Sequence, residues 1–550
     1  MEGDIDMVKK RGLTKIVTAF VCGLLIFLVT GCGADSSSQN SNGGSGSIVL
    51  DNGDPTKLRR LVPEGQTATL KVWRPTHTAI GTLMESFSDT LFNKWMEEQT
   101  GVKIEWIIPV SGTEADNLAM LISSQEYPDI FFDAGLVYPT GAYGLMKDGV
   151  VIDVAQYLDK LPNYRAELER SDIRKKESYS DTGEMAAFYR FMMNDEPNST
   201  DYGLLIRKDM LDKVGKSIPE TYDEWYEVLK EFKKAGLERP YLLNSTGFPK
   251  LNMFTGGLGF GYMNYGGSTQ PFYQVDGKVR YAPLEEGFKT YLQMMNKWYE
   301  EGLIDQDFLS LNSISAELTL YFDPNSGSYA APLSLADVAR QIAPDPSMEF
   351  VSAPHPVVNK GDKIHIGPPA SPVFAGAQIS SKTDKLDLAL QWLDLYYSPD
   401  VILASNFGPD PSYYEQRADG SYAFNDKVFN NPDGFAPVDM MMYVADYPMV
   451  NYKDRSIGNE QLLGWVEENN KINDNAYLIS SSLTLSDEEN KVYASIMPGI
   501  IDYVEEMQVK YIMGLESFDG YDAFVQKIYD MGIEEVISVY QKALDRYNSR

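Results

Sequence analysis

The first ordered part of the chain alternates between two hydrophobic periodicities. Apolar residues at every second position, and one short apolar run, predict strands at residues 70–74, 102–108 and 127–133. Apolar residues at helical spacing predict the intervening helices, at 91–96 and 118–122. Strands that alternate with helices are typical of a parallel sheet with crossover helices. We therefore predict an α/β fold, with ligands meeting the carboxyl ends of the strands.

Further elements follow the same rules along the rest of the chain. Apolar runs predict two buried strands, at 185–189 and 203–207. Helical spacing predicts long helices at 221–232, 285–301, 385–397 and 521–547. Thr221 and Glu224 form the sequence signature of a capping box, and Gly532 interrupts the last helix. We find no internal repeat.

An apolar run at residues 16–29 is shorter than the roughly 20 residues that a membrane-spanning helix needs. Four basic residues precede it and small residues lie just before Cys32, which is the layout of a secretory signal. Acidic residues before Met7 leave either Met1 or Met7 as the start. Residues 34–47 are mostly Ser, Asn, Gln and Gly, which predicts a flexible tether that reaches about 20 Å.

Composition narrows the possible chemistry. The 550 residues contain two cysteines, Cys22 and Cys32, and three histidines. Cys22 lies in the predicted leader, so we expect no disulfide, no thiol catalysis and no histidine-rich metal centre. The formal net charge of −31 disfavours nucleic acid and anionic lipid headgroups as partners. We predict no cofactor, no metal, and contact with a membrane only through a lipid anchor.

The tetrapeptide Val29-Thr30-Gly31-Cys32 resembles the lipobox of bacterial lipoproteins. The resemblance implies that the Cys32 thiol carries a diacylglyceryl group, that palmitate-type chains hold the protein, and that it lies on the extracellular face of the cell membrane. Two acyl chains hold a protein at a bilayer far more firmly than one. The alternative is a plain secretory signal in which Cys32 is incidental.

Several segments in series resemble the extracellular solute-binding proteins of ABC importers, specifically family 1, the oligosaccharide type of Gram-positive bacteria. Each motif is weak alone, but together they span residue 67 to the C-terminus in the family's order. They are 128–130, 205–211, 220–225, 298–305 and 540–547.

The resemblance implies a periplasmic-binding-protein-like fold with two lobes, each a mainly parallel sheet flanked by helices, joined by crossing hinge strands. We place the crossings at 201–207 and near 374–380. The expected domains are a signal peptide (1–31), lipidated Cys and tether (32–66), first lobe (67–202 and 366–410) and second lobe (203–365 and 411–550).

The implied function is capture of an oligosaccharide in an interlobe cleft and its delivery to the transmembrane permease subunits of an ABC transporter. We expect a monomer that is not an enzyme. Three alternatives remain open. They are a peptide or other small-solute binder of the same fold, a lipid-anchored glycoside hydrolase with two carboxyls roughly 5 to 9.5 Å apart, and a surface adhesin.

A sugar site combines aromatic plates with a few fixed polar groups. The strand-end rule selects Arg74, His77 and Asp133, and proximity to the first crossing selects Tyr189 and Tyr202. The remaining candidates are Trp73, Arg190, Phe254, Asn264 and Trp465. We expect the other tryptophans on periodic apolar faces to be core residues: Trp106, Trp225, Trp298 and Trp392.

The chain departs from its relatives in two places. Many long relatives carry a calcium-binding loop after the helix at 221–232, but residues 233–240 lack the acids, and 323–327 reads as a simple turn. The segment 407–411 replaces a glycine-rich turn. Residues 256–261 are glycine-rich but match neither a P-loop nor a dinucleotide fingerprint.

Overall fold

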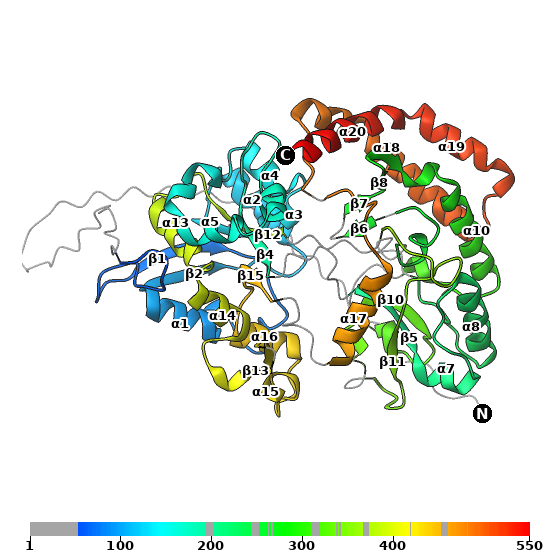
Figure 1. Cartoon of the computed structure of the whole chain (residues 1–550), viewed down its shortest axis with the longest axis horizontal. Coiled ribbons are helices and arrows are strands. Elements are labelled where there is room, and N and C mark those ends of the chain that lie inside the picture. The colour runs from blue at the N-terminus through cyan, green and yellow to red at the C-terminus, as the bar shows by residue number, and fades with distance from the viewer. Residues whose placement is uncertain are drawn as a thin grey trace, which may run out of the picture. The chain divides into compact units, whose positions relative to one another are not determined.

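The structure is a computed structural model that describes residues 53–550 with gaps. The gaps are 194–201, 244–251, 262, 266–267, 311–318, 337–338, 340–342, 367–372, 419, 453–459 and 481. The predicted leader, Cys32 and most of the tether region therefore lie outside the described residues. The chain divides into units 1–47 and 48–550, and the two largest sheets among the described residues of the second unit have six and three strands (Figure 1).

A six-stranded sheet forms the first lobe, in the order β15-β4-β12-β3-β1-β2. β1 runs parallel to β2 and β3 as predicted, whereas β12 runs antiparallel to β3 and β4. Because β15 also runs parallel to β4, five of the six strands share one direction and only β12 is reversed, so the sheet is mainly parallel as predicted. Its strands are β1 Ala68–Trp73, β2 Val102–Ile107, β3 Ile130–Phe132, β4 Phe188–Met192, β12 Val373–Ile379 and β15 Val450–Asn451.

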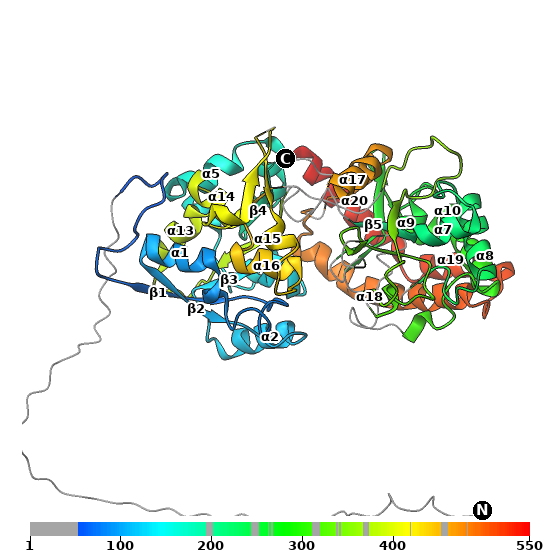
Figure 2. The same cartoon turned by 90° about the horizontal axis from the view of Figure 1, so that it is seen from below.

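Helices gather around this sheet (Figure 2). Apolar residues of the strands, such as Val72 and Phe132, pack with Trp392 of α13 in one buried cluster, which confirms Trp392 as core. Trp106 differs, because it is only partly buried at the edge of that cluster. The helices are α1 Leu91–Thr100, α2 Glu114–Ser124, α3 Ala134–Val137, α4 Gly141–Lys147, α5 Pro162–Leu168, α6 Asp172–Ser178, α13 Leu386–Leu395, α14 Pro399–Phe407, α15 Asp426–Phe429 and α16 Pro437–Val444.

A three-stranded sheet, in the order β10-β5-β11, forms the second lobe. Its strands are β5 Tyr202–Arg207, β10 Ser328–Pro332 and β11 Phe350–Ala353. The sequence predicted a mainly parallel sheet here, but β5 lies in the centre and runs antiparallel to both neighbours. The difference arises because β10 and β11 follow β5 only after a long helical excursion, so no short β-α-β crossover fixes a parallel direction.

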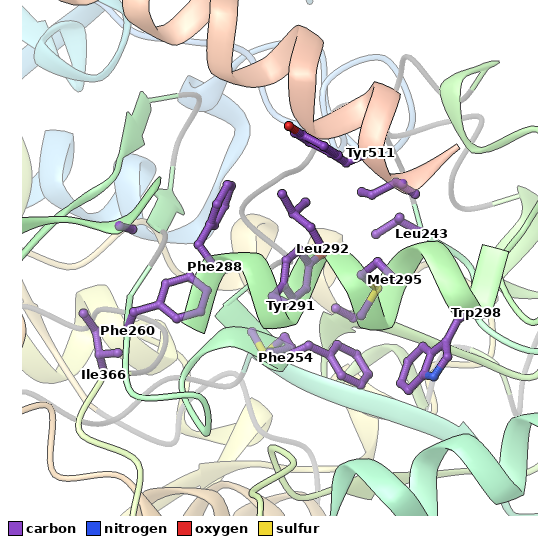
Figure 3. Packing of buried hydrophobic residues seen from close by; sticks show 14 of the residues in the cluster. Leu243, Phe254, Phe260, Phe288, Tyr291, Leu292, Met295, Trp298, Ile366 and Tyr511 are labelled. Carbon is purple, nitrogen blue, oxygen red and sulfur yellow. The ribbon is translucent and has the colours of Figure 1, made fainter. Parts of the chain in front are cut away.

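The helices of the second lobe pack on one large hydrophobic cluster. Thr221 and Glu224 make the predicted capping box of α8, and the apolar face of α10 packs Met295 and Trp298 into the cluster (Figure 3). No helix among the described residues is long and apolar enough to cross a bilayer. The larger helices are α7 Lys208–Val214, α8 Tyr222–Lys234, α10 Glu286–Glu300, α17 Glu460–Ile472, α18 Asp487–Ile512, α19 Tyr521–Asp530 and α20 Ile533–Ser549.

The chain changes lobe at positions that differ in part from the sequence prediction. β5 and β12, predicted as the crossing strands, each pair within one sheet only, so neither strand itself joins the two sheets. The segment after residue 410 was predicted in the second lobe. It returns instead to the first, where β15 pairs with β4 and covers its edge. The second lobe resumes with α17.

A cluster of charged side chains joins α20 to the segment around α6 of the first lobe. We call it the C-terminal junction, and it consists of Glu177, Asp181, Glu489, Arg546, Tyr547 and Arg550. Arg546 donates to Asp181 Oδ2 at 2.7 Å and forms a bidentate pair with Glu489 at 2.6 and 2.7 Å. Arg550 Nε donates to Asp181 Oδ1 at 2.9 Å. Tyr547, Ser480 and Ser482 donate to the buried Glu177.

Candidate functional site

Two charged side chains follow neighbouring parallel strands of the first lobe. Arg74 comes directly after β1 and Asp133 directly after β3, and the register pairs Trp73 with Phe131. The carboxyl ends of parallel strands meet at one edge of a sheet, so these two residues leave the sheet side by side. Both side chains are buried. The strand-end rule therefore brought together two of the residues that the sequence predicted.

The backbone at Asp133 has an unusual conformation that the neighbouring strand supports. Asp133 has φ 56° and ψ 14°, the left-handed region that few non-glycine residues adopt. Its N–H donates to the carbonyl of Gly376 at 2.8 Å, beside the bulge in β12 between Phe374 and Gly376. A Cβ on Gly376 would lie 1.9 Å from the Phe188 carbonyl oxygen. The glycine thus permits the close strand approach that holds Asp133 in place.

Two buried ion pairs lie at this edge of the sheet. Arg74 Nη1 lies 2.7 Å from Asp446 Oδ1, and Arg190 Nη2 of β4 lies 2.8 Å from Asp133 Oδ2. All four side chains are at most one-tenth exposed. Asp133 Oδ1 and Arg190 Nε have no hydrogen-bond partner among the described residues. The site therefore contains neutralised charges together with one unpaired acceptor and one unpaired donor.

An aromatic ring lies over both guanidinium groups. The ring centre of Tyr447 is 5.1 Å from Arg74 Cζ and 4.9 Å from Arg190 Cζ, and the residue is 39% exposed. The Tyr447 N–H donates to Asp446 Oδ1, which also pairs with Arg74. We call Arg74, Asp133, Arg190, Asp446 and Tyr447 the Tyr447 cluster. Such cation–π contacts hold an aromatic side chain in a fixed position.

His77 extends the cluster as a neutral side chain. Its ring meets the edge of the Tyr447 ring at a centroid distance of 6.1 Å. Burial lowers the pKa of His77, although nearby Asp439 opposes the shift. The Ala79 N–H donates to His77 Nδ1 at 3.1 Å, so the neutral imidazole carries its proton on Nε2. At neutral pH this ring is an uncharged hydrogen-bond donor.

Two of the predicted aromatic plates are core residues in the structure. Trp73 is fully buried, and its Nε1–H donates to Asn117 Oδ1 at 2.8 Å. Phe254 is 1% exposed and lies in the second-lobe core, with its ring perpendicular to that of Trp298 (Figure 3). A ring without an exposed face offers no surface on which a sugar can stack.

The other four predicted residues lie on β4, β5, β6 and α17. Tyr189 of β4 is half-buried against the first-lobe core, and burial raises its pKa to about 12. Tyr202 begins β5, and Trp465 of α17 is half-buried against the second-lobe core. Asn264 lies on the short strand β6, Met263–Tyr265, opposite Thr269. The structure therefore joins four of the ten predicted residues: Arg74, His77, Asp133 and Arg190.

Sequence reasoning missed Asp446 and Tyr447. Both lie in the loop after α16, where Tyr447 precedes Pro448. The sequence did contain a signal for this site. An acidic and an aromatic residue stand side by side before a proline, between a helix and a short strand. Among the described residues, no group of three or more His, Cys, Asp or Glu side chains is arranged to hold a metal ion.

Comparison with known proteins matches residues 76–402 to the family described as bacterial extracellular solute-binding protein. The polygalacturonan/rhamnogalacturonan-binding protein YtcQ of Bacillus subtilis (strain 168) is 22% identical over 462 residues, which cover 82% of this chain and 87% of YtcQ. Lipoprotein LipO of the same organism is 25% identical over 225 residues, which cover 40% of this chain and 42% of LipO.

A solved structure extends the comparison to the fold. The fructooligosaccharide ABC transporter substrate-binding protein FusA of Streptococcus pneumoniae is 23% identical over 341 residues, which cover 58% of this chain and 60% of FusA. Its structure in complex with kestose aligns with a TM-score of 0.70 at 19% identity and covers 88% of this chain and 99% of that chain. This likeness confirms the predicted two-lobed fold.

Proposed function

Because the chain belongs to the family of bacterial extracellular solute-binding proteins, we propose that it captures an oligosaccharide between its lobes and delivers it to an ABC transporter permease. The Tyr447 cluster is the observation that carries this proposal. An exposed ring held over two buried cations, at the carboxyl ends of parallel strands, suits the flat C–H face of a sugar. The relatives YtcQ and FusA are named for carbohydrate ligands, which supports the same ligand class here.

We propose two groups of binding residues, one within the Tyr447 cluster and one outside it. Tyr447 is the stacking plate, while Arg74, Arg190, Asp133 and His77 form the polar frame beneath and beside it. The other predicted residues remain proposed contacts for the remainder of an oligosaccharide: Tyr189, Tyr202, Asn264 and Trp465. The interlobe cleft is itself part of the proposal.

Capture without chemistry is favoured over hydrolysis of the sugar. A glycoside hydrolase needs one carboxylic acid that can donate a proton to the leaving group. In the Tyr447 cluster, Asp446 and Asp133 each hold a guanidinium at 2.7 and 2.8 Å, so both carboxyl groups already have a structural partner. This arrangement favours a binding role for the two acids over proton donation to a leaving group. The small-solute alternative keeps the same fold but would not need a broad aromatic plate.

A lipid anchor at Cys32 completes the proposal. LipO, a relative of this chain, is named a lipoprotein. We expect that the Cys32→Ser variant, expressed in a Gram-positive host, is released into the medium, whereas the unchanged chain stays in the membrane fraction and incorporates labelled palmitate. Retention of the variant in that fraction, or an unlabelled parent chain, would contradict the anchor but not solute capture.

A thermal-shift screen tests the proposed function directly. Oligosaccharides of several classes, peptides and monosaccharides are each added to the purified chain, because a bound solute raises apparent stability by RT ln(1 + [L]/Kd). We expect an oligosaccharide hit that also reduces the radius of gyration in solution scattering and is recovered uncleaved. Peptide hits alone, or cleaved sugar, would refute the proposal.

A further inference from the structure

The charges of the Tyr447 cluster indicate which oligosaccharides the site accepts. Arg74 and Arg190 contribute two positive charges, while Asp133, Asp446 and the adjacent Asp439 contribute three negative charges. Each arginine already forms an ion pair, with nitrogen–oxygen distances of 2.7 Å for Arg74 and Asp446 and 2.8 Å for Arg190 and Asp133. The group as a whole therefore has one surplus negative charge. An incoming carboxylate would meet this negative charge in a partly buried, low-dielectric place, where repulsion is strong.

The unpaired polar atoms favour a hydroxyl group. Arg190 Nε–H is a donor and Asp133 Oδ1 is an acceptor, and both are buried without a partner among the described residues. Both atoms are closed to solvent in this form, so a sugar hydroxyl reaches them only when the side chains around them move on binding; it can then accept from one and donate to the other, since it has both capacities. A carboxylate can only accept, so it would leave Asp133 unsatisfied and repel it. The neutral His77, with its proton on Nε2, adds a second donor suited to a hydroxyl.

From this arrangement we infer that the Tyr447 cluster selects uncharged glycans and rejects uronic-acid glycans of the same length, with Tyr447 as the stacking residue. The inference rests on the proposed function and deepens it. Without the ion pairs, two arginines under an exposed ring would indicate the opposite preference. Asp133 and Asp446 reverse that expectation, because each carboxylate already forms an ion pair with one of the arginines and neutralises its charge before a ligand arrives.

Calorimetry with matched ligands tests the inference. The probes are neutral gluco-, fructo- and manno-oligosaccharides and oligogalacturonates of equal length, titrated into the purified full chain. We expect at least one neutral series to bind tenfold or more tightly than the oligogalacturonate. Tighter binding of oligogalacturonate would overturn the inference and leave solute capture intact. Binding of neither class would overturn both the proposed function and the inference.

Two variants with matched controls assign the preference to this site. Tyr447→Ala is expected to weaken the neutral ligand tenfold or more, while Tyr529→Ala, which removes a tyrosine that is 40% exposed on α19, changes Kd less than twofold. Asp439→Asn removes the surplus negative charge, so the ratio of neutral to uronate affinity should fall at least threefold. Asp172→Asn, the same charge change on the exposed surface, should leave that ratio unaltered. Unaltered binding by Tyr447→Ala would refute the assigned site.

Discussion

The Tyr447 cluster and the C-terminal junction use the same guanidinium–carboxylate chemistry in two different ways. Their Arg-to-acid distances are alike, at 2.7 and 2.8 Å in the cluster and 2.6 to 2.9 Å in the junction. In the junction, both oxygens of Glu177, Asp181 and Glu489 accept hydrogen bonds. In the cluster, Asp133 Oδ1 and Arg190 Nε have no partner within the part of the chain that the structure describes, and Tyr447 above them is 39% exposed.

The difference separates a structural contact from a surface with the features that we propose for ligand binding. Every carboxylate oxygen of Glu177, Asp181 and Glu489 already accepts a hydrogen bond from within the protein, as expected of a contact that joins one segment to another. The cluster combines unpaired polar atoms with an exposed aromatic face. Charge count alone would not separate these two regions.

Breaking the ion pair of the Tyr447 cluster should have the largest effect. Arg74→Met leaves Asp446 buried without its guanidinium, which should cost about 3 to 5 kcal/mol in the free energy of unfolding, measured by chemical denaturation. Adding Asp446→Asn to the same chain removes the uncompensated charge and should restore much of the loss. A single variant as stable as the parent chain would show that the pair is not buried in solution.

The backbone support of Asp133 is the next most sensitive feature. Gly376→Ala places a Cβ 1.9 Å from the Phe188 carbonyl oxygen, so the strands must separate, at a cost of about 1 to 3 kcal/mol. Gly464→Ala is the control, since its Cβ meets nothing within 4 Å and α17 should gain up to about 1 kcal/mol. Equal melting temperatures for the two variants would contradict the close approach of β4 and β12.

The junction should tolerate loss of one arginine better than the cluster does. Arg546→Gln removes the bonds to Asp181 and Glu489, but Arg546 is about one-third exposed, so solvent screening limits the loss to about 1 kcal/mol. Solution scattering of this variant should show a larger radius of gyration, because the Asp181 contact joins the two lobes. Arg165→Gln, which breaks an exposed pair with Glu169, should alter neither measurement.

Acidification should affect the two regions in separate pH windows. Burial lowers the pKa of His77 below its ordinary 6.5, so the folded state binds fewer protons than the unfolded state and stability falls as pH drops below about 6.5. Burial alone would raise the pKa of Glu489, but hydrogen bonds from Arg546 and Ser486 outweigh it and hold the pKa below the ordinary 4.5. The contribution of Glu489 to folding stability is therefore lost only as the pH falls below about 4.5.

Two variants separate these windows in denaturation curves recorded from pH 7 to 3. His77→Gln should flatten the stability profile below pH 6.5, with a residual slope from His355, whose pKa burial lowers to about 4. Glu489→Gln should flatten only the most acidic part. If both variants changed the same window, the contrast in protonation between cluster and junction would be wrong.

Sequence patterns predicted the elements that depend on local signals. The capping box at Thr221, the helix of Trp298 and the break at Gly532 follow from neighbouring residues, and the structure confirms them. The 26-residue helix α18 was not predicted, because Pro498 lies inside it and normally disfavours a helix interior. The strand directions of the second lobe also escaped prediction, since they depend on distant pairing.

The residues of the candidate site also differ in whether local sequence or distant chain pairing determines their position. Arg74 and Asp133 could be predicted because adjacent parallel strands end at one edge of a sheet. Tyr447 could not, because its position depends on the chain returning to the first lobe as far as β15. Trp73 and Phe254 were chosen for their ring chemistry, but residue type does not reveal which face of a strand or helix is covered.

Two positions of this site differ in how well they tolerate substitution. Position 376 admits no side chain, since the carbonyl of Phe188 already occupies the space, whereas Tyr447 already faces solvent. If the proposed site is correct, a single codon change at position 447 can therefore exchange the ligand-facing side chain and leave the backbone around Asp133 unchanged. Duplicated copies of such a gene can diverge toward different nutrients without first solving a new folding problem.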